Sequence, residues 1–342
     1  MVLRRVTVLG HPNSFDARRV AGLLGCLGLL ALCVLASIAI GSRATSLGDV
    51  LAAFSAYDGS DEHVIVRELR VPRTELGLLV GAALGAAGAL MQGVTRNPLA
   101  EPGILGVNAG AAFAVVLAIA LLGATSPTAY AVVALVGAAL TAVAIFALGG
   151  RAATPVRLAL AGAVLATLLV SLTSAVLVFD ARTLDEFRFW IVGSIAGRDP
   201  AVAASVLPFI AAGLAIALAA GRRLNALALG DDVARSLGQR VGHTRAAASL
   251  GFVLLAGGAV AAAGPVAFVG LAVPHVARLV AGPDYRWIVP YSIVLGACLL
   301  LAGDVAGRMV ARPAELEVGI VTALLGAPFF IWLVRRRRAV AL

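Results

Sequence analysis

The sequence contains no lysine, and few of its residues carry a charge. All 27 basic residues are arginines, charged residues make up 13% of the 342, and hydrophobic residues make up 61%. Because a soluble domain carries about 25% charged residues, this composition predicts a protein that faces membrane lipid. The net charge of +9 does not indicate a nucleic-acid partner, because basic residues gather in the cytoplasmic loops of membrane proteins.

Cysteines, histidines and nucleotide-binding motifs are scarce or missing. The three cysteines lie inside apolar runs, which argues against a disulfide framework, and the four histidines lack the spacing of metal ligands. The phosphate-binding pattern GxxxxGK(S/T) does not occur, so the chain is not expected to hydrolyse ATP. No residue spacing marks a catalytic set. We therefore expect no enzyme activity, no metal site and no cofactor bound by this chain.

Apolar windows recur along the whole chain. A helix needs roughly 20 mainly apolar residues to cross a bilayer. The windows cover residues 20–41, 76–94, 105–123, 128–149, 156–178, 200–220, 246–264, 266–280, 287–304 and 317–334. The first exceeds the apolar core of a cleaved signal peptide, about 7–15 residues, so we expect it to be retained. The predicted fold is an all-α membrane protein of about ten transmembrane helices, in a single domain over residues 1–342.

The arginines predict the orientation of the chain. If the N-terminus is cytoplasmic and there are ten spans, the inner segments hold 18 of the 27 arginines and five of the 18 acidic residues. This excess agrees with the positive-inside rule. Both termini are thus predicted to be cytoplasmic, with tails at residues 1–19 and 335–342, and the longest cytoplasmic segment covers residues 221–245.

That cytoplasmic segment has the pattern of a short amphipathic helix. Leu229, Val233 and Leu237 recur near helical spacing, two aspartates suit the first turn, and Gly238 can end the helix. A helix of this kind can lie in the membrane interface or dock in a partner's groove. A solvated loop is the alternative interpretation.

Three arginines stand just before the second apolar window, on the predicted outer side. Arg67, Arg70 and Arg73 break the charge rule there. Arginine forms bidentate pairs with carboxylates, so the cluster could dock an acidic partner. Pairing with the nearby Glu68 and Glu75 is the alternative.

Two prolines and several polar residues interrupt the apolar sequence at "RNPLAEPGILG", residues 96–106. The pairs Asn97-Pro98 and Glu101-Pro102 favour turns and prevent helical continuation. Their polar side chains can satisfy backbone groups left unpaired at the inner boundary. We interpret this turn as a determinant of the fold and not as a substrate site.

Other features of the spans point to close helix packing and to a second break. Gly81, Gly85 and Gly88 share one helical face, where backbones can approach closely. Residues 264–282 contain two prolines and His275, and irregular backbone at membrane depth is tolerated only where protein or a cavity surrounds it. His275 could be a ligand or a proton carrier, with a structural cap as the alternative.

Taken together, these segments resemble the FecCD family, the membrane permeases of ABC importers for iron–siderophores, haem and vitamin B12. The similarity runs from about residue 67 to residue 334. Its motifs, in the family's order, are "RELRVPR", "GAALGAAGALMQGVTRNPLAEPGILGVNAGA", "LNALALGDDVARSLG", "FVGLAVPHVAR", "GDVAGR" and "VGIVTALLGAPFFIWLV".

The resemblance implies a permease that works as a dimer in the cytoplasmic (inner) membrane. The second permease subunit can be an identical or a related chain. Two ABC ATPase subunits, which bind ATP and Mg, would dock on the cytoplasmic side, and an extracytoplasmic substrate-binding protein would cap the outer side.

The resemblance also assigns roles to residues. It implies that the ATPase is coupled through Leu229, Gly230, Asp231, Ala234, Arg235, Leu237 and Gly238. It implies that the binding protein docks through Arg70, Arg73 and Arg308. Structural roles within family motifs are implied for Arg96, Asn97, Pro98, Leu99, Pro102, Gly106, Pro274, His275, Arg278, Gly326 and Pro328.

One departure from the family concerns the last helix. The family carries Leu-Pro-Val-Gly where this chain reads "LEVG", so Glu317 replaces a proline and the local backbone is open to question. The function expected from the resemblance is import of a ferric siderophore by alternating access, with cobalamin or haem as alternative cargo. A secondary transporter without an ATPase is a further alternative, and it predicts a buried ionisable residue at mid-membrane.

Overall fold

The computed structural model describes residues 12–335, except 102, 104–105 and 150–154. Pro102 of the turn and most of the C-terminal tail thus lie outside the described residues. All regular elements within the described ranges are helices, so the predicted all-α fold is confirmed.

Each predicted apolar window coincides with a helix. These helices are α1 (Pro12–Ala39), α4 (Val71–Thr95), α5 (Val107–Leu122), α6 (Pro127–Gly149), α7 (Pro155–Phe179), α9 (Pro200–Ala228), α11 (Val241–Ala263), α12 (Val269–Ala281), α13 (Tyr285–Val310) and α14 (Val318–Arg335). Seven helices in the described ranges are long and apolar enough to cross a membrane, whereas α5, α12 and α14 contribute shorter apolar segments. The chain is therefore a multi-pass membrane protein, and the count of ten spans and the side of the termini stay predictions.

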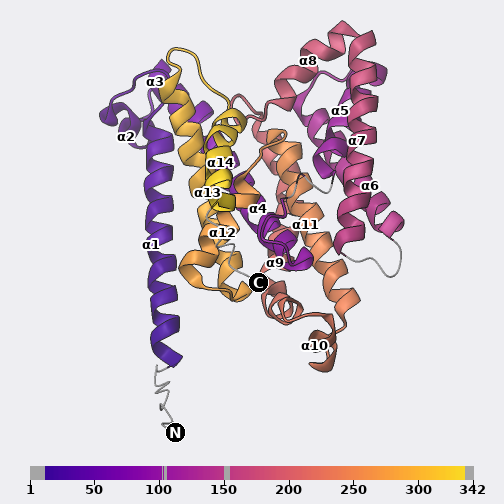
Figure 1. Ribbon diagram of the computed structural model, residues 1–342. Coiled ribbons are helices and arrows are strands. Elements are labelled where there is room, and N and C mark those ends of the chain that lie inside the picture. Colours follow the sequence, from indigo (N-terminus) through magenta and orange to yellow (C-terminus); the bar gives the residue numbers. More distant parts are fainter. Residues whose placement is uncertain (1–11, 102, 104–105, 150–154, 336–342) are drawn as a thin grey trace.

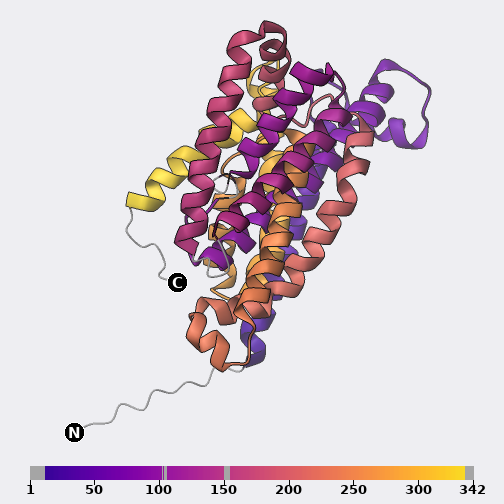
Figure 2. The same cartoon turned by 90° about the vertical axis from the view of Figure 1, so that its right-hand side faces the viewer.

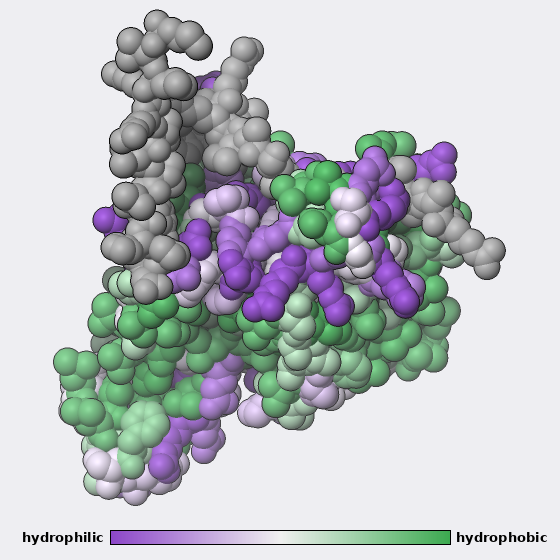
Figure 3. Space-filling view, turned by 90° about the horizontal axis from the view of Figure 1, so that it is seen from below, coloured by the Kyte–Doolittle hydropathy of each residue, from purple (hydrophilic) through white to green (hydrophobic). Residues whose placement is uncertain are grey.

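Short helices lie at the two ends of the bundle (Figure 1). One end carries α2 (Leu47–Ser55), α3 (Asp61–Val64), the π-helix η1 (Ile65–Arg70) and α8 (Ala181–Ile191). The opposite end carries α10 (Asp231–Ser236). We name these the outer end and the inner end, after the sides that the charge pattern predicts for them. Hydrophilic residues gather across the face seen from the inner end, with apolar surface around them (Figure 3).

Helix α4 forms the centre of the bundle, packed against α9, α11, α12 and α13. The predicted glycine face makes these contacts: a Cβ on Gly81 would lie 2.6 Å from Cα of Ala297, and one on Gly88 would collide with the carbonyl of Gly270. Backbones therefore touch directly where α4 crosses α13 and α12, as small residues in membrane helices allow.

The flanking helices have the opposite character. Only 6% of the apolar window of α1 and 11% of that of α7 are buried, against 83% for the helix that contains α4. Helices α1 and α7 lie on opposite flanks (Figure 1), and α14 leans obliquely away from the bundle (Figure 2). Their exposed apolar surfaces suit contact with lipid or with further membrane helices.

Candidate coupling and docking sites

Residues 221–245, the predicted cytoplasmic segment, contain helix α10. Gly230 precedes the helix with φ 106° and ψ 157°, and Gly238 follows it with φ 80°. Glycine adopts such positive φ values at little cost. The two glycines thus turn the chain sharply on both sides of α10, which presents the helix at the inner end (Figure 1).

The apolar side chains of this segment are exposed. Leu229 and Leu237 are 63% and 62% exposed and Val233 is 44% exposed, whereas Ala234 is buried against the protein. Val233 lies within α10 and the two leucines flank the helix, and together they form a surface that a partner can cover. We call this surface the apolar ridge: Leu229, Val233 and Leu237.

Asp231 connects α10 to two transmembrane helices. Its Oδ1 lies 2.9 Å from Nη2 of Arg245 on α11 and 3.5 Å from Nη2 of Arg96 at the end of α4. Arg235 reaches Oδ2 of the same carboxylate at 4.0 Å and pairs with Asp232 at 2.8 Å. A movement of α10 would therefore act directly on the ends of α4 and α11.

The turn that follows α4 is held by its own polar groups. Arg96 ends α4 in the left-handed conformation at φ 49°, which is uncommon for a non-glycine residue. The side chain of Asn97 accepts a hydrogen bond from the amide of Leu99 at 3.0 Å, across Pro98. This is the local turn that asparagine before proline favours. Gly106, at φ 71°, then starts α5 close to the backbone of α7.

Glu101 makes the longest-range contact of this turn. Its Oε1 accepts a hydrogen bond of 2.6 Å from the amide of Phe268, the residue that precedes α12. Phe268 has φ 67° and packs against Gly326 of α14. The sequence indicated that polar groups here satisfy free backbone, but it did not identify a partner 167 residues away.

Removing this carboxylate is expected to destabilise the protein. Glu101→Ala leaves the Phe268 amide unpaired in a partly buried site, at a cost of about 1–3 kcal/mol. Glu101→Gln keeps an oxygen acceptor and is the matched control. We expect the thermal unfolding midpoint in detergent to fall for alanine and to stay nearer the wild-type value for glutamine. Equal midpoints for the two variants would show that the hydrogen bond is not the stabilising feature.

Two polar residues of the break at residues 264–282 differ in their hydrogen bonding: Arg278 is bonded to neighbouring helices, and one ring nitrogen of His275 is not bonded. Arg278 donates to Oε1 of Gln92 at 3.1 Å and to the Tyr285 hydroxyl at 3.4 Å, so it joins α12 to α4 and α13. His275, one residue after Pro274 within α12, is 4% exposed and meets the ring of Phe329 edge-on. Its Nδ1 has no hydrogen-bond partner among the described residues, and the roles of ligand, proton carrier and structural cap stay predictions.

The last helix begins normally despite the missing family proline. The carbonyl of Glu317 accepts from the amides of Ile320 and Val321, and α14 starts at the next residue. Gly326 lies against the ring of Phe268, and Pro328 stands inside the helix. The replacement therefore preserves the start of α14.

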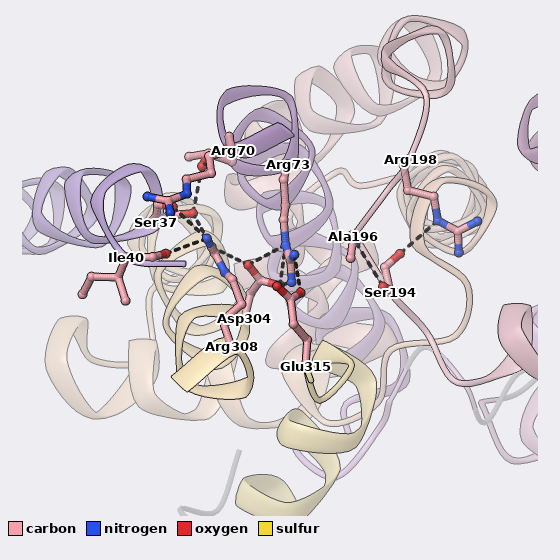
Figure 4. Close-up of polar contacts among 11 residues, drawn as sticks. Ser37, Ile40, Arg70, Arg73, Ser194, Ala196, Arg198, Asp304, Arg308 and Glu315 are labelled. Carbon is pink, nitrogen blue, oxygen red and sulfur yellow. Dashed lines mark hydrogen bonds and ion pairs between the residues drawn. The ribbon is translucent and has the colours of Figure 1, made fainter. Parts of the chain in front are cut away.

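Two of the outer arginines hold the end of α1. Arg70 donates to the carbonyls of Ile38, Ala39 and Arg43 at 2.8–3.0 Å, and Arg308 donates to those of Ser37 and Ile40 at 2.9 and 2.8 Å. Carbonyls in the last turn of a helix lack internal partners, and the two guanidinium groups supply the missing donors (Figure 4).

The third outer arginine forms a buried ion network. Arg73 donates to Asp304 through Nε at 3.0 Å and Nη2 at 2.7 Å, and to Glu315 through Nη1 at 2.6 Å. Arg308 donates to the other oxygen of Asp304 at 2.6 Å. Burial raises the pKa of Glu315 and the adjacent Arg73 lowers it, with a net result below the usual value.

This geometry changes the interpretation of the outer cluster. Arg70 is 4% and Arg308 is 1% exposed, and both have acceptors inside the chain, so neither presents a free fork to a partner in this structure. The alternative pairing with Glu68 and Glu75 is also not seen, because the acidic partners of Arg73 come from α13 and the segment after it. Local sequence carried no signal for partners 231 and 242 residues away.

A cavity of about 540 Å³ opens beside this network at the outer end. It lies between the start of α4, the segment after α1 and the loop that joins α8 to α9. Arg198 of that loop lines the cavity, and sequence analysis did not single it out. Burial lowers the pKa of Arg198, while the charge of Glu317 acts in the opposite direction.

Comparisons with known proteins agree with this architecture. Residues 29–336 match the FecCD transport family. The chain is 44% identical over 329 residues to the ferric enterobactin transport system permease protein FepD of Escherichia coli, covering 95% of this chain and 98% of that protein. It is 40% identical over 283 residues to the cobalamin import system permease protein BtuC of Halobacterium salinarum, covering 82% and 75%. A solved structure described as an inward-facing metal-chelate type ABC transporter matches with a TM-score of 0.82 and 29% identity, over 92% and 98% of the two chains.

Proposed function

Because the chain belongs to the FecCD transport family, we propose that it is the transmembrane permease subunit of an ATP-driven importer for a ferric siderophore. The observation that carries the coupling part of this proposal is the apolar ridge on α10. It is exposed at the inner end, and its helix is tied by Asp231 to α4 and α11. A cytoplasmic ATPase seated on this ridge can move both helices at once.

The proposed partners follow from the family. Two ABC ATPase subunits bind ATP and Mg and hydrolyse the nucleotide, and this chain has no part in that chemistry. A second permease subunit, identical or related, completes the membrane unit. The exposed apolar faces of α7 and α14 are available for such a helix contact or for lipid.

The mechanism we propose is alternating access driven from the inner end. When the ATPases close, α10 shifts and its Asp231 carries the movement to Arg96, where the turn after α4 begins. Glu101 of the same turn holds Phe268, which packs on α14. This is a contiguous route of ion pair, turn, hydrogen bond and packing contact from the ATPase site to the last helix, as energetic coupling through a fold requires.

The outer end is the proposed docking face for the substrate-binding protein. Arg70, Arg73 and Arg308 belong to this face, and their intramolecular bonds support a role in shaping it: they fix the ends of α1, α4 and α13 beneath the partner. Exposed charges such as Arg67, stacked over Tyr57 at 4.8 Å, and Arg312 are the groups open to direct contact.

Ferric siderophore is the proposed cargo because relatives of high identity are named for ferric chelates. Cobalamin is the second candidate, since one relative at 40% identity is named for it. A secondary transporter predicts an ionisable group at mid-membrane. Glu101 is a half-buried carboxylate in the turn between α4 and α5, where its bond to the Phe268 amide gives it a structural role, and the structural neighbour is an ABC transporter.

The test is uptake of labelled ferric siderophores, cobalamin and haem by a deletion strain that carries wild-type or variant chain. Leu237→Asp places a charge in the apolar ridge, where it must be desolvated under the ATPase. We expect uptake to fall to less than about a tenth, the result of losing roughly 1.4 kcal/mol or more of coupling. Leu237→Met keeps an apolar side chain and is the matched control.

The outcomes separate the parts of this proposal. Selective loss of one ferric siderophore, restored by Leu237→Met and not by Leu237→Asp, supports both cargo and coupling. Loss of cobalamin or haem uptake alone would move the cargo to the second candidate. Full uptake by a Leu237→Asp chain that is present in the membrane at wild-type amount would refute the coupling role of the ridge.

A further inference from the structure

Arg198, in the wall of the outer cavity, has hydrogen-bond donors that the described residues leave unpaired. Nε of Arg198 donates to the carbonyl of Ser194 at 3.1 Å, which orients the guanidinium group (Figure 4). Its two terminal nitrogens have no hydrogen-bond acceptor within the part of the chain that the structure describes. Arg73, across the network, has all its contacts taken up by Asp304 and Glu315. Arg198 thus has both terminal nitrogens unpaired within the described residues, whereas the unpaired donor of Arg308 is its buried Nε.

More arginines than acidic residues line the wall of the cavity. Five arginines and three acidic residues line it: Arg43, Arg70, Arg73, Arg198, Arg308, Glu68, Asp199 and Glu315. Ion pairs within the chain engage three of these arginines. For the other two, Arg70 and Arg198, no carboxylate of the described residues lies at ion-pair distance, and Arg70 is bonded to neutral oxygens only. The positive charge that an anion can meet in the cavity is thus that of Arg70 and Arg198, the two arginines without a carboxylate in contact.

The nearest acidic influence on Arg198 comes from Glu317, at the start of α14. This charge raises the pKa of Arg198, but burial without a close carboxylate lowers it more. A guanidinium group in this state gains from an added anion, because the anion replaces the hydration that burial removed. The glutamate that departs from the family pattern is thus the carboxylate whose charge acts on Arg198 without contacting it.

We propose that Arg198 forms an anion subsite that receives the negatively charged oxygens of the cargo at the outer end. The ligand class is a ferric chelate with net negative charge, such as a carboxylate or catecholate complex. One oxygen would accept from the terminal nitrogens of Arg198, and the field of Arg70 would add attraction. This inference rests on the proposed function and deepens it: the importer favours anionic over neutral ferric chelates.

A small ligand fits the geometry better than a partner's side chain. The subsite is a concave space of about 540 Å³, and small-molecule sites are typically concave with a few fixed polar groups. The outer surface around the cavity already presents exposed arginines for a protein partner. The cargo therefore takes the recessed guanidinium, and the binding protein meets the rim.

The test measures binding to the full chain in nanodiscs of zwitterionic lipid. The probes are iron-55 ferric citrate, which is anionic, a neutral ferric trihydroxamate, and citrate without iron. Charge-assisted hydrogen bonds contribute enough that Arg198→Gln should weaken ferric citrate binding about ten- to hundredfold. Arg198→Lys keeps the positive charge but lacks the paired donors of the guanidinium group, so its affinity for ferric citrate should lie between those of wild type and Arg198→Gln. The matched control, Arg188→Gln, removes an exposed arginine paired with Asp185 on the neighbouring α8 and should change nothing.

Each result decides the inference. The expected result is that Arg198→Gln and Arg198→Lys weaken binding of the anionic chelate only. Binding of the neutral chelate should be the same for both variants as for wild type. Equal binding of ferric citrate by wild type and Arg198→Gln, or no binding by wild type, would overturn the subsite. Weaker docking of cargo-free binding protein to Arg198→Gln, with chelate binding unchanged, would also overturn it and assign the arginine to the partner. None of these results depends on ATP, so the failure of this inference is distinct from failure of the ridge experiment.

Discussion

Replacement of Asp304 by alanine is expected to lower the free energy of unfolding by about 3–5 kcal/mol, the cost of breaking a buried ion pair from one side. Asp304 is 1% exposed, and it accepts from Arg73 and Arg308 at 2.6–3.1 Å. Its removal leaves two buried guanidinium groups facing each other without the carboxylate between them. Their repulsion acts where α1, α4 and α13 meet, so the outer end should loosen first.

Thermal unfolding in detergent, with limited proteolysis of the outer end, measures this effect. Asp304→Asn keeps an oxygen acceptor without the charge and should fall between alanine and wild type. Asp185→Ala removes an exposed pair with Arg188 at 3.2 Å and should cost less than about 1 kcal/mol. If Asp304→Ala unfolds at the same temperature as Asp185→Ala, the network does not stabilise the outer end.

The elements that sequence predicted best are those fixed by the bilayer. A spanning segment must be apolar and must satisfy its backbone internally, so a long apolar window can only be a helix. The errors lie at the ends, where this constraint stops. Window 200–220 corresponds to a helix that continues to Ala228, because polar residues such as Arg222 and Arg223 extend a helix into water without changing its backbone.

The contacts between segments were beyond local sequence. The pairs Arg73–Asp304 and Glu101–Phe268 are 231 and 167 residues apart, and only the packing of α4, α12 and α13 brings them together. The sequence indicated which residues were unusual in an apolar chain. It could not indicate whether an arginine such as Arg308 points outward or into the protein, because that depends on which helix covers it.

The coupling segment and Arg198 show what local sequence can and cannot predict. For α10, periodicity and two flanking glycines carry the local information, and the observed helix follows from it. For Arg198, nothing in its neighbourhood distinguishes it from other outer arginines. Its distinction is that its terminal nitrogens have no acceptor among the described residues, which is a property of the assembled cavity.

Adding one methyl group at Gly88 is expected to disrupt the centre of the bundle. A Cβ at this position would collide with the carbonyl, carbonyl carbon and Cα of Gly270, so α4 and α12 must separate. Overpacking of a core costs about 1–3 kcal/mol where side chains can yield, and here both walls are backbone. We therefore expect Gly88→Ala to lower the free energy of unfolding by about 3 kcal/mol or more. The variant should also accumulate poorly in the membrane.

The control for Gly88 comes from the same residue type in a different environment. Gly25 lies on the exposed face of α1, and a Cβ there would meet nothing within 4 Å. Both changes, Gly88→Ala and Gly25→Ala, gain the same helix propensity, up to about 1 kcal/mol, so the difference between the variants measures packing alone. Thermal midpoints and yields in detergent provide the comparison. A Gly88→Ala chain as stable as Gly25→Ala would mean that α4 and α12 can move apart freely, and the hydrogen bond between Glu101 and Phe268 would then have to hold the start of α12 without close packing behind it.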